Sequence, residues 1–251
     1  MAKILGRESA EDPVTLYCAR RGCRLASRAR SQGICTTPTM ANRMNDVRES
    51  YDCAGEAYAE HLASELAQKP LDRHLLNRFA EETRGRGLVA DLGCGPGHVA
   101  RYLHDQGVAV VGIDLSPRMI ECAQRLNPDL EFRVGDMRQL ELPVASLVGV
   151  LAFYSIVHFE PSALTVVMTQ MRNVLVTGGL TLISFHIGNE AVHVDDLYGA
   201  PVSLDFRFHL ACDVIAALRA GRFAVIEHVE REPYAGAEYP SRRCYLLARA
   251  I

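Results

Sequence analysis

Three aspartates end three short apolar segments of the chain, and their spacing suits side chains that meet around one ligand. Asp91 ends GLVAD, Asp114 ends VAVVGID and Asp136 ends LEFRVGD. If these segments are neighbouring strands of a parallel sheet, their carboxyl ends lie at one edge, where open α/β sheets bind ligands. Three carboxylates at this edge predict a ligand that carries positive charge.

A glycine-rich turn follows the first aspartate. Gly93, Gly95 and Gly97 alternate in DLGCGPGHVARYL, between an apolar run and a stretch typical of a helix. Glycines let the backbone turn tightly and approach a ligand, and a helix beginning near Gly97 directs free N–H groups at it. Such turns hold NAD, ATP or S-adenosylmethionine, so the glycines alone leave the ligand open. For Cys94, within the turn, a small space-filling role is favoured over that of a nucleophile.

Asp91 favours one of these ligands. Its carboxylate would face the charged part of the ligand, and beside a pyrophosphate it would cost on the order of 1–4 kcal/mol. Beside an ammonium or a sulfonium group it would attract. The spacing G-x-G-x-G also departs from the G-x-G-x-x-G of dinucleotide sites. Asp114 can accept both hydroxyls of a ribose, or merely cap the helix at Ser116, and Asp136 with Met137 offers an acceptor and an apolar surface to adenine.

Strands and helices alternate along the chain and would position these residues. The alternation predicts an α/β fold with a doubly wound, Rossmann-like and mainly parallel sheet, covered by helices on both faces. Only a turn-rich segment separates the last two strands, which predicts an antiparallel hairpin. The polar stretch 187–210 is predicted to be a long loop that shapes the site. The predicted strands are 87–91, 108–114, 130–136, 146–155, 178–187, 223–230 and 242–250, and the predicted helices are 51–62, 71–82, 97–104, 116–125, 161–175 and 213–220.

The segments VADLGCGPGHVARYL, VVGIDLSPRMIECAQ and VGDMRQLELP, with the closing hairpin, resemble class I S-adenosylmethionine-dependent methyltransferases. The resemblance is greatest to the small-molecule branch called type 11 or 25, and it covers about residues 46–250. It implies a seven-stranded sheet of order 3-2-1-4-5-7-6 with the last strand antiparallel. It also implies a domain over 45–251 with a helical cap over about 46–84.

The same resemblance implies which residues bind each part of the cofactor, S-adenosylmethionine. Asp91 and the three glycines would hold its methionine part, and Asp114 would bind its ribose. Leu115 and Met119 would lie by the adenine, which Asp136 and Met137 would hold. Tyr58 lies on the helix that covers the cofactor in similar proteins, although helix packing explains this residue equally well. The full predicted cofactor set is Tyr58, Asp91, Gly93, Cys94, Gly95, Gly97, Asp114, Leu115, Met119, Asp136, Met137 and Tyr154.

His158, in FYSIVHFEP, is the candidate general base. Methyl transfer from a sulfonium mainly needs alignment and exclusion of water, so a base is needed only if the acceptor loses a proton. The alternative is a loop histidine that bonds to the backbone. Tyr154 is expected in the core or the pocket wall, and Tyr51 could bind the methionine carboxylate. Polar residues of the loop would line the acceptor pocket, namely His186, His193, Asp195, Tyr198, Arg207 and His209. Their spacing fits no metal site, so no metal is predicted.

The charge distribution separates residues 1–44 from the rest of the chain. They carry eight Lys/Arg and three Asp/Glu, about +5, within a total of -3. We expect a disordered basic extension there and a mildly acidic body, which argues against nucleic-acid binding. Lys69 and Arg73 are expected to be solvated.

The eight scattered cysteines suggest free thiols, and no apolar stretch reaches the ~18–20 residues of a membrane span. The sequence thus predicts a cytoplasmic methyltransferase, a monomer or homodimer, that methylates a small organic acceptor and leaves S-adenosylhomocysteine. It is expected to bind neither nucleic acid nor membrane. The alternatives are an NAD(P)-dependent oxidoreductase and a non-catalytic S-adenosylmethionine-binding protein.

Overall fold

The computed structural model describes residues 40–251, which belong to the compact unit Thr39–Ile251. The predicted extension, 1–44, therefore lies largely outside the described residues. Its last part is helical, because α2 (Met40–Leu62) begins there and continues through the predicted helix 51–62. Every helix within residues 40–251 is too short or too polar to cross a lipid bilayer.

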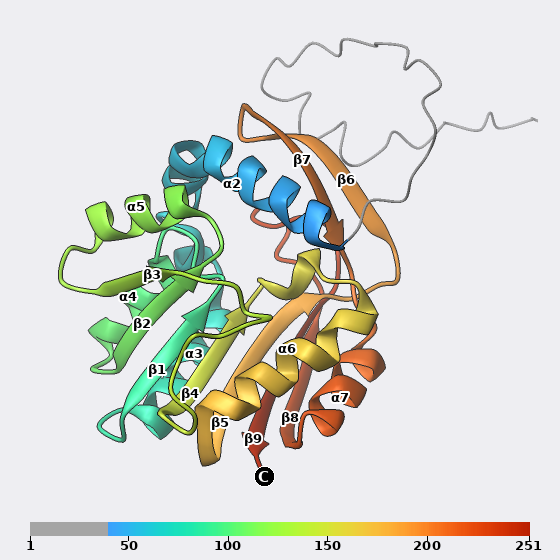
Figure 1. Ribbon diagram of the computed structural model, residues 1–251. Coiled ribbons are helices and arrows are strands. Elements are labelled where there is room, and N and C mark those ends of the chain that lie inside the picture. Colours follow the sequence, from blue (N-terminus) through green and yellow to red (C-terminus); the bar gives the residue numbers. More distant parts are fainter. Residues whose placement is uncertain (1–39) are drawn as a thin grey trace, which may run out of the picture. The chain divides into compact units, whose positions relative to one another are not determined.

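A seven-stranded sheet forms the centre of this unit (Figure 1). Its order is β3-β2-β1-β4-β5-β9-β8, with β1 to β5 parallel and β9 antiparallel to both of its neighbours. The predicted doubly wound fold is confirmed. The numbering of the last two positions differs from the predicted 7-6, because two further strands precede them in the chain and form a separate hairpin. The sheet strands are β1 (Leu88–Leu92), β2 (Ala109–Asp114), β3 (Glu131–Val134), β4 (Leu147–Phe153), β5 (Leu175–His186), β8 (Phe223–Arg231) and β9 (Arg243–Ala250).

Helices cover both faces of the sheet, as predicted. On one face, Val167 and Leu218 of α6 and α7 belong to the apolar core that includes the inner residues of β4 and β5. On the other face, Phe79 and Leu103 of α3 and α4 belong to a second core. Burial of both sheet faces explains why the central strands are nearly continuous apolar runs. The remaining helices are η1 (Glu65–Gln68), α3 (Pro70–Thr83), α4 (His98–Asp105), α5 (Pro117–Leu126), η2 (Ile156–His158), α6 (Pro161–Val174) and α7 (Ala211–Ala220).

Local signals in the sequence account for several helix starts. Pro70, Pro117 and Pro161 each stand in a first turn, where a missing N–H costs no hydrogen bond. Ser116 caps α5, because its hydroxyl accepts a hydrogen bond from the backbone N–H of Met119 at 3.1 Å. This cap fixes the connection between β2 and α5, which carries Asp114.

The predicted loop at 187–210 is wrong, because most of it forms an antiparallel hairpin of β6 (Ala191–Leu197) and β7 (Ala200–Arg207). Tyr198 and Gly199 form its two-residue turn with φ of 56° and 88°, the region that hairpin turns of this length require. The hairpin lies beside α2 (Figure 1), and the Ser203 N–H donates a hydrogen bond to Ser50 Oγ at 3.0 Å.

β5 also begins earlier than predicted. It follows α6 directly at Leu175, so that Gly178, the first residue of the predicted strand, lies within β5, with φ of 81°. Its far end, at His186, lies at the same edge of the sheet as the aspartates that end the neighbouring strands.

Candidate active site

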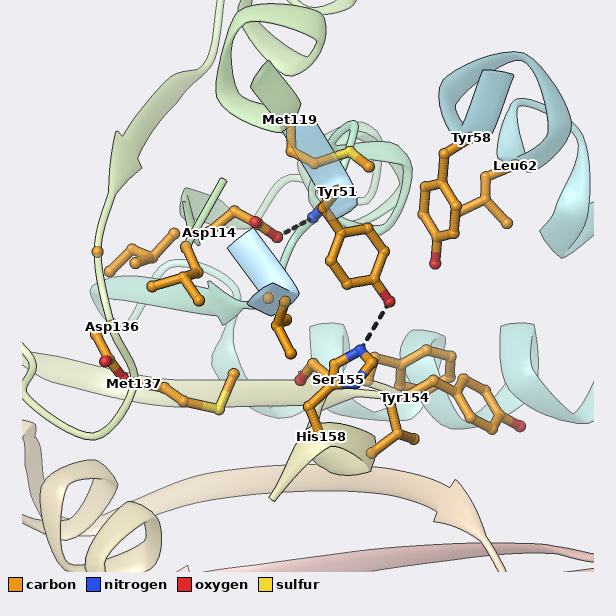
Figure 2. Close-up of a pocket in the computed structure, with 18 of the residues that line it drawn as sticks. Tyr51, Tyr58, Leu62, Asp114, Met119, Asp136, Met137, Tyr154, Ser155 and His158 are labelled. Atoms are coloured by element: carbon orange, nitrogen blue, oxygen red, sulfur yellow. Dashed lines mark hydrogen bonds between the residues drawn. The ribbon is translucent and has the colours of Figure 1, made fainter. Parts of the chain in front are cut away.

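A pocket of about 950 Å³, partly open to solvent, lies at the carboxyl ends of β1, β2 and β4 (Figure 2). α2 forms part of its wall, so residues more than a hundred positions apart meet across it. Most of the predicted cofactor residues and the candidate base line it: Tyr58, Gly93, Gly95, Asp114, Leu115, Met119, Asp136, Met137, Tyr154 and His158. The structure thus brings the predicted site together, except for three residues of the glycine motif.

The glycines of the turn have different roles. All three have positive φ, which favours glycine. At Gly93 a Cβ would lie 2.4 Å from Cβ of Ser155, so this glycine lets β1 and the end of β4 approach at the pocket floor. Gly97 does not line the pocket, because it faces Phe132, whose ring would lie 2.6 Å from an added Cβ. Gly97 therefore fits α4 against the sheet.

Asp114 anchors the turn to β2. Its Oδ2 accepts a hydrogen bond from the Gly95 N–H at 2.8 Å, and its Oδ1 accepts one from the Ser116 N–H at 2.9 Å. Burial raises the pKa of Asp114, while these two N–H groups act in the opposite direction. Asp114 therefore does accept a hydrogen bond from the residue that caps α5, Ser116, and each carboxylate oxygen keeps a second lone pair for a ligand hydroxyl.

Asp91 lies beneath the turn and does not line the pocket. It is 1% exposed, and its Oδ2 has no hydrogen-bond partner among the described residues. Burial raises the pKa of Asp91 to about 7, with a further increase from Asp114 and a decrease from His98. Cys94 also lies outside the lining, and burial raises its pKa, so the space-filling interpretation holds better than that of a nucleophile.

Asp136 lines the pocket but is already bound to a cation. Arg138 donates hydrogen bonds from Nε to both of its carboxylate oxygens, at 3.0 and 2.9 Å, and forms an ion pair with it through Nη2 at 2.5 Å. The carboxylate is therefore partly neutralised before any ligand binds.

His158 is held from two sides. Its Nδ1 lies 3.0 Å from the carbonyl oxygen of Asp205 in the hairpin, and its Nε2 lies 2.9 Å from the hydroxyl of Tyr51 in α2 (Figure 2). A carbonyl can only accept, so Nδ1 carries the proton and Nε2 accepts from Tyr51. Burial lowers the pKa of His158 to about 4, which keeps the ring neutral. The backbone contact of the alternative interpretation is thus present, and the Nε2 lone pair, which the general-base hypothesis requires, is occupied by the Tyr51 hydroxyl.

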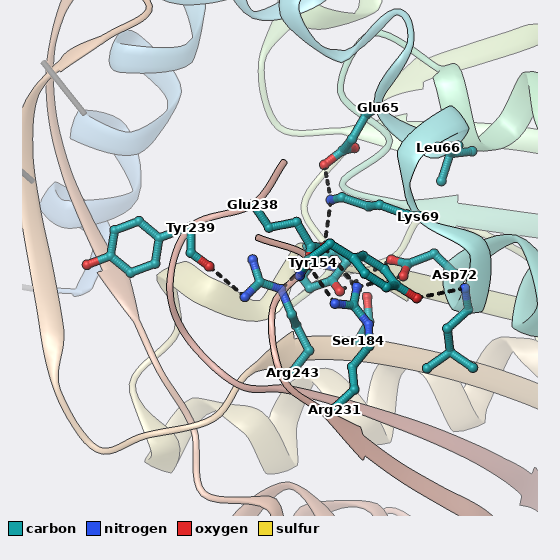
Figure 3. A network of polar contacts seen from close by, with 12 residues as sticks. Glu65, Leu66, Lys69, Asp72, Tyr154, Ser184, Arg231, Glu238, Tyr239 and Arg243 are labelled. Carbon is teal, nitrogen blue, oxygen red and sulfur yellow. Dashed lines mark hydrogen bonds and ion pairs between the residues drawn. The ribbon is translucent and has the colours of Figure 1, made fainter. Parts of the chain in front are cut away.

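Tyr154 joins the pocket to a group of buried charges (Figure 3). Its φ of 53° is strained for a tyrosine. Its hydroxyl lies 2.7 Å from that of Tyr245 and 3.3 Å from Asp72 Oδ1. Tyr154 therefore forms part of the pocket wall while its hydroxyl points into the neighbouring group.

We call this group the paired network; it consists of Glu65, Lys69, Asp72, Arg231, Glu238 and Arg243. Arg231 bonds to Asp72 at 2.8 Å and to Glu238 at 2.6 Å, and Arg243 Nε lies 3.4 Å from Glu238. Lys69, which we expected to be solvated, is 6% exposed and pairs with Glu65 and with Glu238. The expectation for Lys69 is wrong because the segment after β8, distant in sequence, covers it.

Two further lining residues were absent from the sequence prediction. Glu65 and His98 lie at the pocket wall, with His98 Nε2 3.1 Å from Glu65 Oε2. Burial raises the pKa of Glu65, but the hydrogen bond from His98 and the charge of Lys69 outweigh it and bring the pKa to about 2. Glu65 is therefore a second buried carboxylate at this end of the pocket.

The polar residues predicted to line an acceptor pocket do not line this one. His193 bonds to Asp195 and Asp205 on the exposed side of the hairpin, and Tyr198 stacks on His61 at 3.8 Å. The others lie as follows: His186 bonds to Ser241, Arg207 to Glu160, and buried His209 to the Ile156 carbonyl. Among residues 40–251, the side chains close enough for a shared metal ion are His228, Glu230 and Cys244, outside the pocket lining.

Known proteins support the assignment of the fold. Residues 89–179 match a family model described as a methyltransferase domain. A structure of 1,6-didemethyltoxoflavin-N1-methyltransferase from Burkholderia thailandensis is 18% identical with a TM-score of 0.65, covering 87% of this chain and 93% of that chain. The fold therefore extends over most of the described residues.

Curated relatives are methyltransferases by name. Malonyl-[acyl-carrier protein] O-methyltransferase of Serratia marcescens is 31% identical over 58% of this chain and 56% of its own length. Trans-aconitate 2-methyltransferase of an Escherichia coli O157:H7 strain is 48% identical over 31% of this chain and 30% of its own length. The chain thus spans about half or less of these relatives, and neither the oxidoreductase nor the non-catalytic alternative gains support. From its motifs, its sheet and these matches, the chain is similar to the class I S-adenosylmethionine-dependent methyltransferases, with a match to a methyltransferase domain over residues 89–179.

Proposed function

We propose that this protein transfers a methyl group from S-adenosylmethionine to a small organic acceptor and leaves S-adenosylhomocysteine. The domain over 45–251, with a helical cap over about 46–84, is part of this proposal. The main support is the charge of the pocket at the glycine turn, which is acidic and suits a cationic ligand.

The charges around the pocket distinguish the candidate ligands. Glu65, Asp114 and Asp136 line it, and no lysine or arginine does so among the described residues. Asp91, beneath the turn, has a buried oxygen without a hydrogen-bond partner in that part of the chain. A pyrophosphate here would meet carboxylates without a lysine or arginine in the lining, whereas an ammonium or a sulfonium would be attracted. This pattern argues against NAD(P) and for the adenosyl cofactor.

The residues present fit S-adenosylmethionine along its whole length. Asp114 has lone pairs for the ribose hydroxyls, and Leu115, Met119 and Met137 offer apolar surface to the adenine. At the other end, Asp91 and Glu65 would compensate the methionine ammonium. When bound, the cofactor supplies an electrophilic methyl group on a good leaving group.

The chain's own residues would orient the acceptor, exclude water and accept a proton. α2 covers the pocket, and the hairpin fixes His158 through the Asp205 carbonyl. His158 is neutral, the form that a general base needs, and its Nε2 lone pair becomes available when the Tyr51 hydroxyl is displaced. For an acceptor with an acidic proton, His158 is the group we assign to take it.

The five cysteines of the described residues are free thiols, which supports the expected reducing compartment, the cytoplasm.

Calorimetry with S-adenosylhomocysteine and with NADH tests the cofactor assignment. We expect binding of S-adenosylhomocysteine and none of NADH. Asp114→Ala should weaken S-adenosylhomocysteine binding about 100-fold, about 2.7 kcal/mol, because it removes the acceptor of the ribose hydroxyls. Asp105→Ala, an exposed aspartate of α4 outside the pocket, is the matched control and should bind as the wild type does. Binding of NADH with no binding of S-adenosylhomocysteine would overturn the proposal.

A further inference from the structure

The side of the pocket that contains His158 presents a hydrogen-bond acceptor with a fixed direction. The carbonyl of Asp205 holds the proton on Nδ1 of His158, so Nε2 offers one lone pair. The Tyr51 hydroxyl occupies that lone pair at 2.9 Å. An O–H or N–H donor of comparable size can replace this hydroxyl at Nε2, so that the buried imidazole nitrogen keeps a hydrogen-bond partner.

Aromatic rings surround this lone pair. Tyr51 lies edge-on to Tyr58, with ring centroids 5.6 Å apart, and edge-on to His158 at 5.4 Å (Figure 2). Phe153 and Tyr154 continue the wall and lie edge-on to each other at 5.2 Å. Walls of this kind favour a flat ring that packs offset or edge-on against them.

The charges near the acceptor side do not suit an anionic group. Lys69 Nζ lies 5.2 Å from the Tyr154 ring centroid, but it pairs with Glu65 and Glu238 in the paired network (Figure 3). Arg231 and Arg243 of that network are bound to carboxylates as well. A carboxylate acceptor would have to lose its water beside Glu65 and Asp114 without a free cation among the described lining residues, which is costly.

Resting on the proposed function, we infer that the acceptor is an uncharged aromatic or heteroaromatic compound whose O–H or N–H replaces the Tyr51 hydroxyl at Nε2 of His158. The acceptor oxygen or nitrogen forms the new bond to the methyl carbon. The sulfur–carbon bond breaks with its electron pair left on sulfur, and the acceptor proton passes to Nε2. The resulting imidazolium then releases that proton to water.

Matched pairs of probes test the inference on the full chain loaded with S-adenosylhomocysteine. Catechol is compared with 3,4-dihydroxybenzoate, and benzimidazole with benzimidazole-5-carboxylate, by ligand-observed NMR titration; trans-aconitate serves as a polycarboxylate probe. We expect the uncharged member of at least one pair to bind, and its carboxylate partner to bind at least tenfold more weakly. Tighter binding of the carboxylates or of trans-aconitate, or binding of neither uncharged probe, overturns the inference.

Two variants separate a direct contact with His158 from a general change of the pocket. His158→Phe should weaken binding of the uncharged probe about tenfold. Tyr51→Phe should strengthen its binding about threefold, because this variant removes the competing hydroxyl. Tyr102→Phe, whose hydroxyl bonds to Asn77 outside the pocket, is the control and should change nothing. If His158→Phe and Tyr51→Phe weakened binding of the uncharged probe equally, the probe would not take the place of the Tyr51 hydroxyl at His158. Binding of S-adenosylhomocysteine is measured on the same samples, so that loss of the acceptor inference is distinguished from loss of the proposed function.

Discussion

Two groups of buried ionisable side chains lie next to each other at the carboxyl edge of the sheet, and they differ in how their charge is compensated. In the paired network, Asp72 and Glu238 each bond to Arg231, and all three side chains are largely buried. At the pocket, Asp91 has an oxygen without a partner among residues 40–251, and Asp114 accepts hydrogen bonds from the backbone N–H groups of Gly95 and Ser116.

This difference separates a structural function from a binding function. A buried carboxylate with its own cation holds elements together, whereas a buried carboxylate without one carries a free-energy cost that a cationic ligand can reduce. The paired network joins α3 to β8 and to the segment before β9. The pocket carboxylates, by contrast, are compensated when a cation binds. Removing a charge from the paired network should therefore lower the stability of the fold, whereas removing a charge from the pocket carboxylates should lower the affinity for the cofactor.

The largest effect is expected for Asp72→Asn in the paired network. Asp72 is fully buried, and its Oδ2 accepts from Arg231 Nη2 and from the Tyr245 hydroxyl, both at 2.8 Å. Removing the Asp72 charge takes one of two carboxylates from the buried Arg231, which keeps only Glu238, and leaves the paired network with an excess positive charge. The free energy of unfolding should therefore fall by about 3–5 kcal/mol. Urea denaturation measures this change.

A surface ion pair provides the control for Asp72→Asn. Arg242 pairs with Glu230 and Glu232 in a half-exposed position, so Arg242→Ala should change the free energy of unfolding by less than about 1 kcal/mol. If Asp72→Asn were no more destabilising than Arg242→Ala, the paired network would have no structural role.

Asp91→Asn at the pocket should stabilise the cofactor-free protein and weaken cofactor binding, whereas Asp72→Asn destabilises the fold. The pKa of Asp91 is about 7 in the folded protein and near 3.8 when unfolded, so the folded state binds the extra proton between these values. The free energy of unfolding of the cofactor-free protein therefore decreases as pH rises from about 4 to 7, and the variant lacks this decrease. At pH 8 the cofactor-free variant should be more stable than the wild type by about 2 kcal/mol, part of the ~4 kcal/mol that a three-unit shift represents.

The same substitution should weaken S-adenosylmethionine binding about tenfold, about 1.4 kcal/mol, because the ligand loses an opposite charge. Denaturation between pH 4 and 8 and calorimetry at pH 8 measure the two effects. An unchanged pH profile together with unchanged affinity would show that Asp91 is purely structural and that the acidic pocket does not select the cofactor.

The sequence allowed the pocket carboxylates to be predicted far better than the paired network. Asp91, Asp114 and Asp136 lie at or just after the ends of three strands, and alternation of strands and helices is enough to bring such ends to one edge. The paired network depends on contacts such as that between Asp72 and Arg231, which lie 159 positions apart. Local patterns carry no information about such a pair, which is why Lys69 was expected in solvent.

Local patterns also did not predict the hairpin of β6 and β7, or the contacts that it and α2 make with His158. The hairpin turn is Tyr198-Gly199, and not one of the Asn-Gly or Asp-Gly pairs that mark such turns. Without it, the partner of His158 Nδ1 could not be identified, and the contact between Tyr51 and His158 spans 107 positions. The candidate base was therefore predictable as a residue, but its tautomer and its hydrogen-bond partners were not.

Asp136→Asn should have the smallest effect, because Asp136 is the lining carboxylate that already has an arginine. Arg138 reaches both of its oxygens, so a cationic ligand gains little from its charge. Adenine is uncharged and needs only an acceptor for its amino group, which the asparagine oxygen also supplies. We expect S-adenosylmethionine binding to weaken only twofold to threefold, less than about 1 kcal/mol, by calorimetry at pH 8. A tenfold loss would mean that Asp136 acts on the ligand as Asp91 does, and pairing with a cation would then no longer separate the two kinds of buried carboxylate.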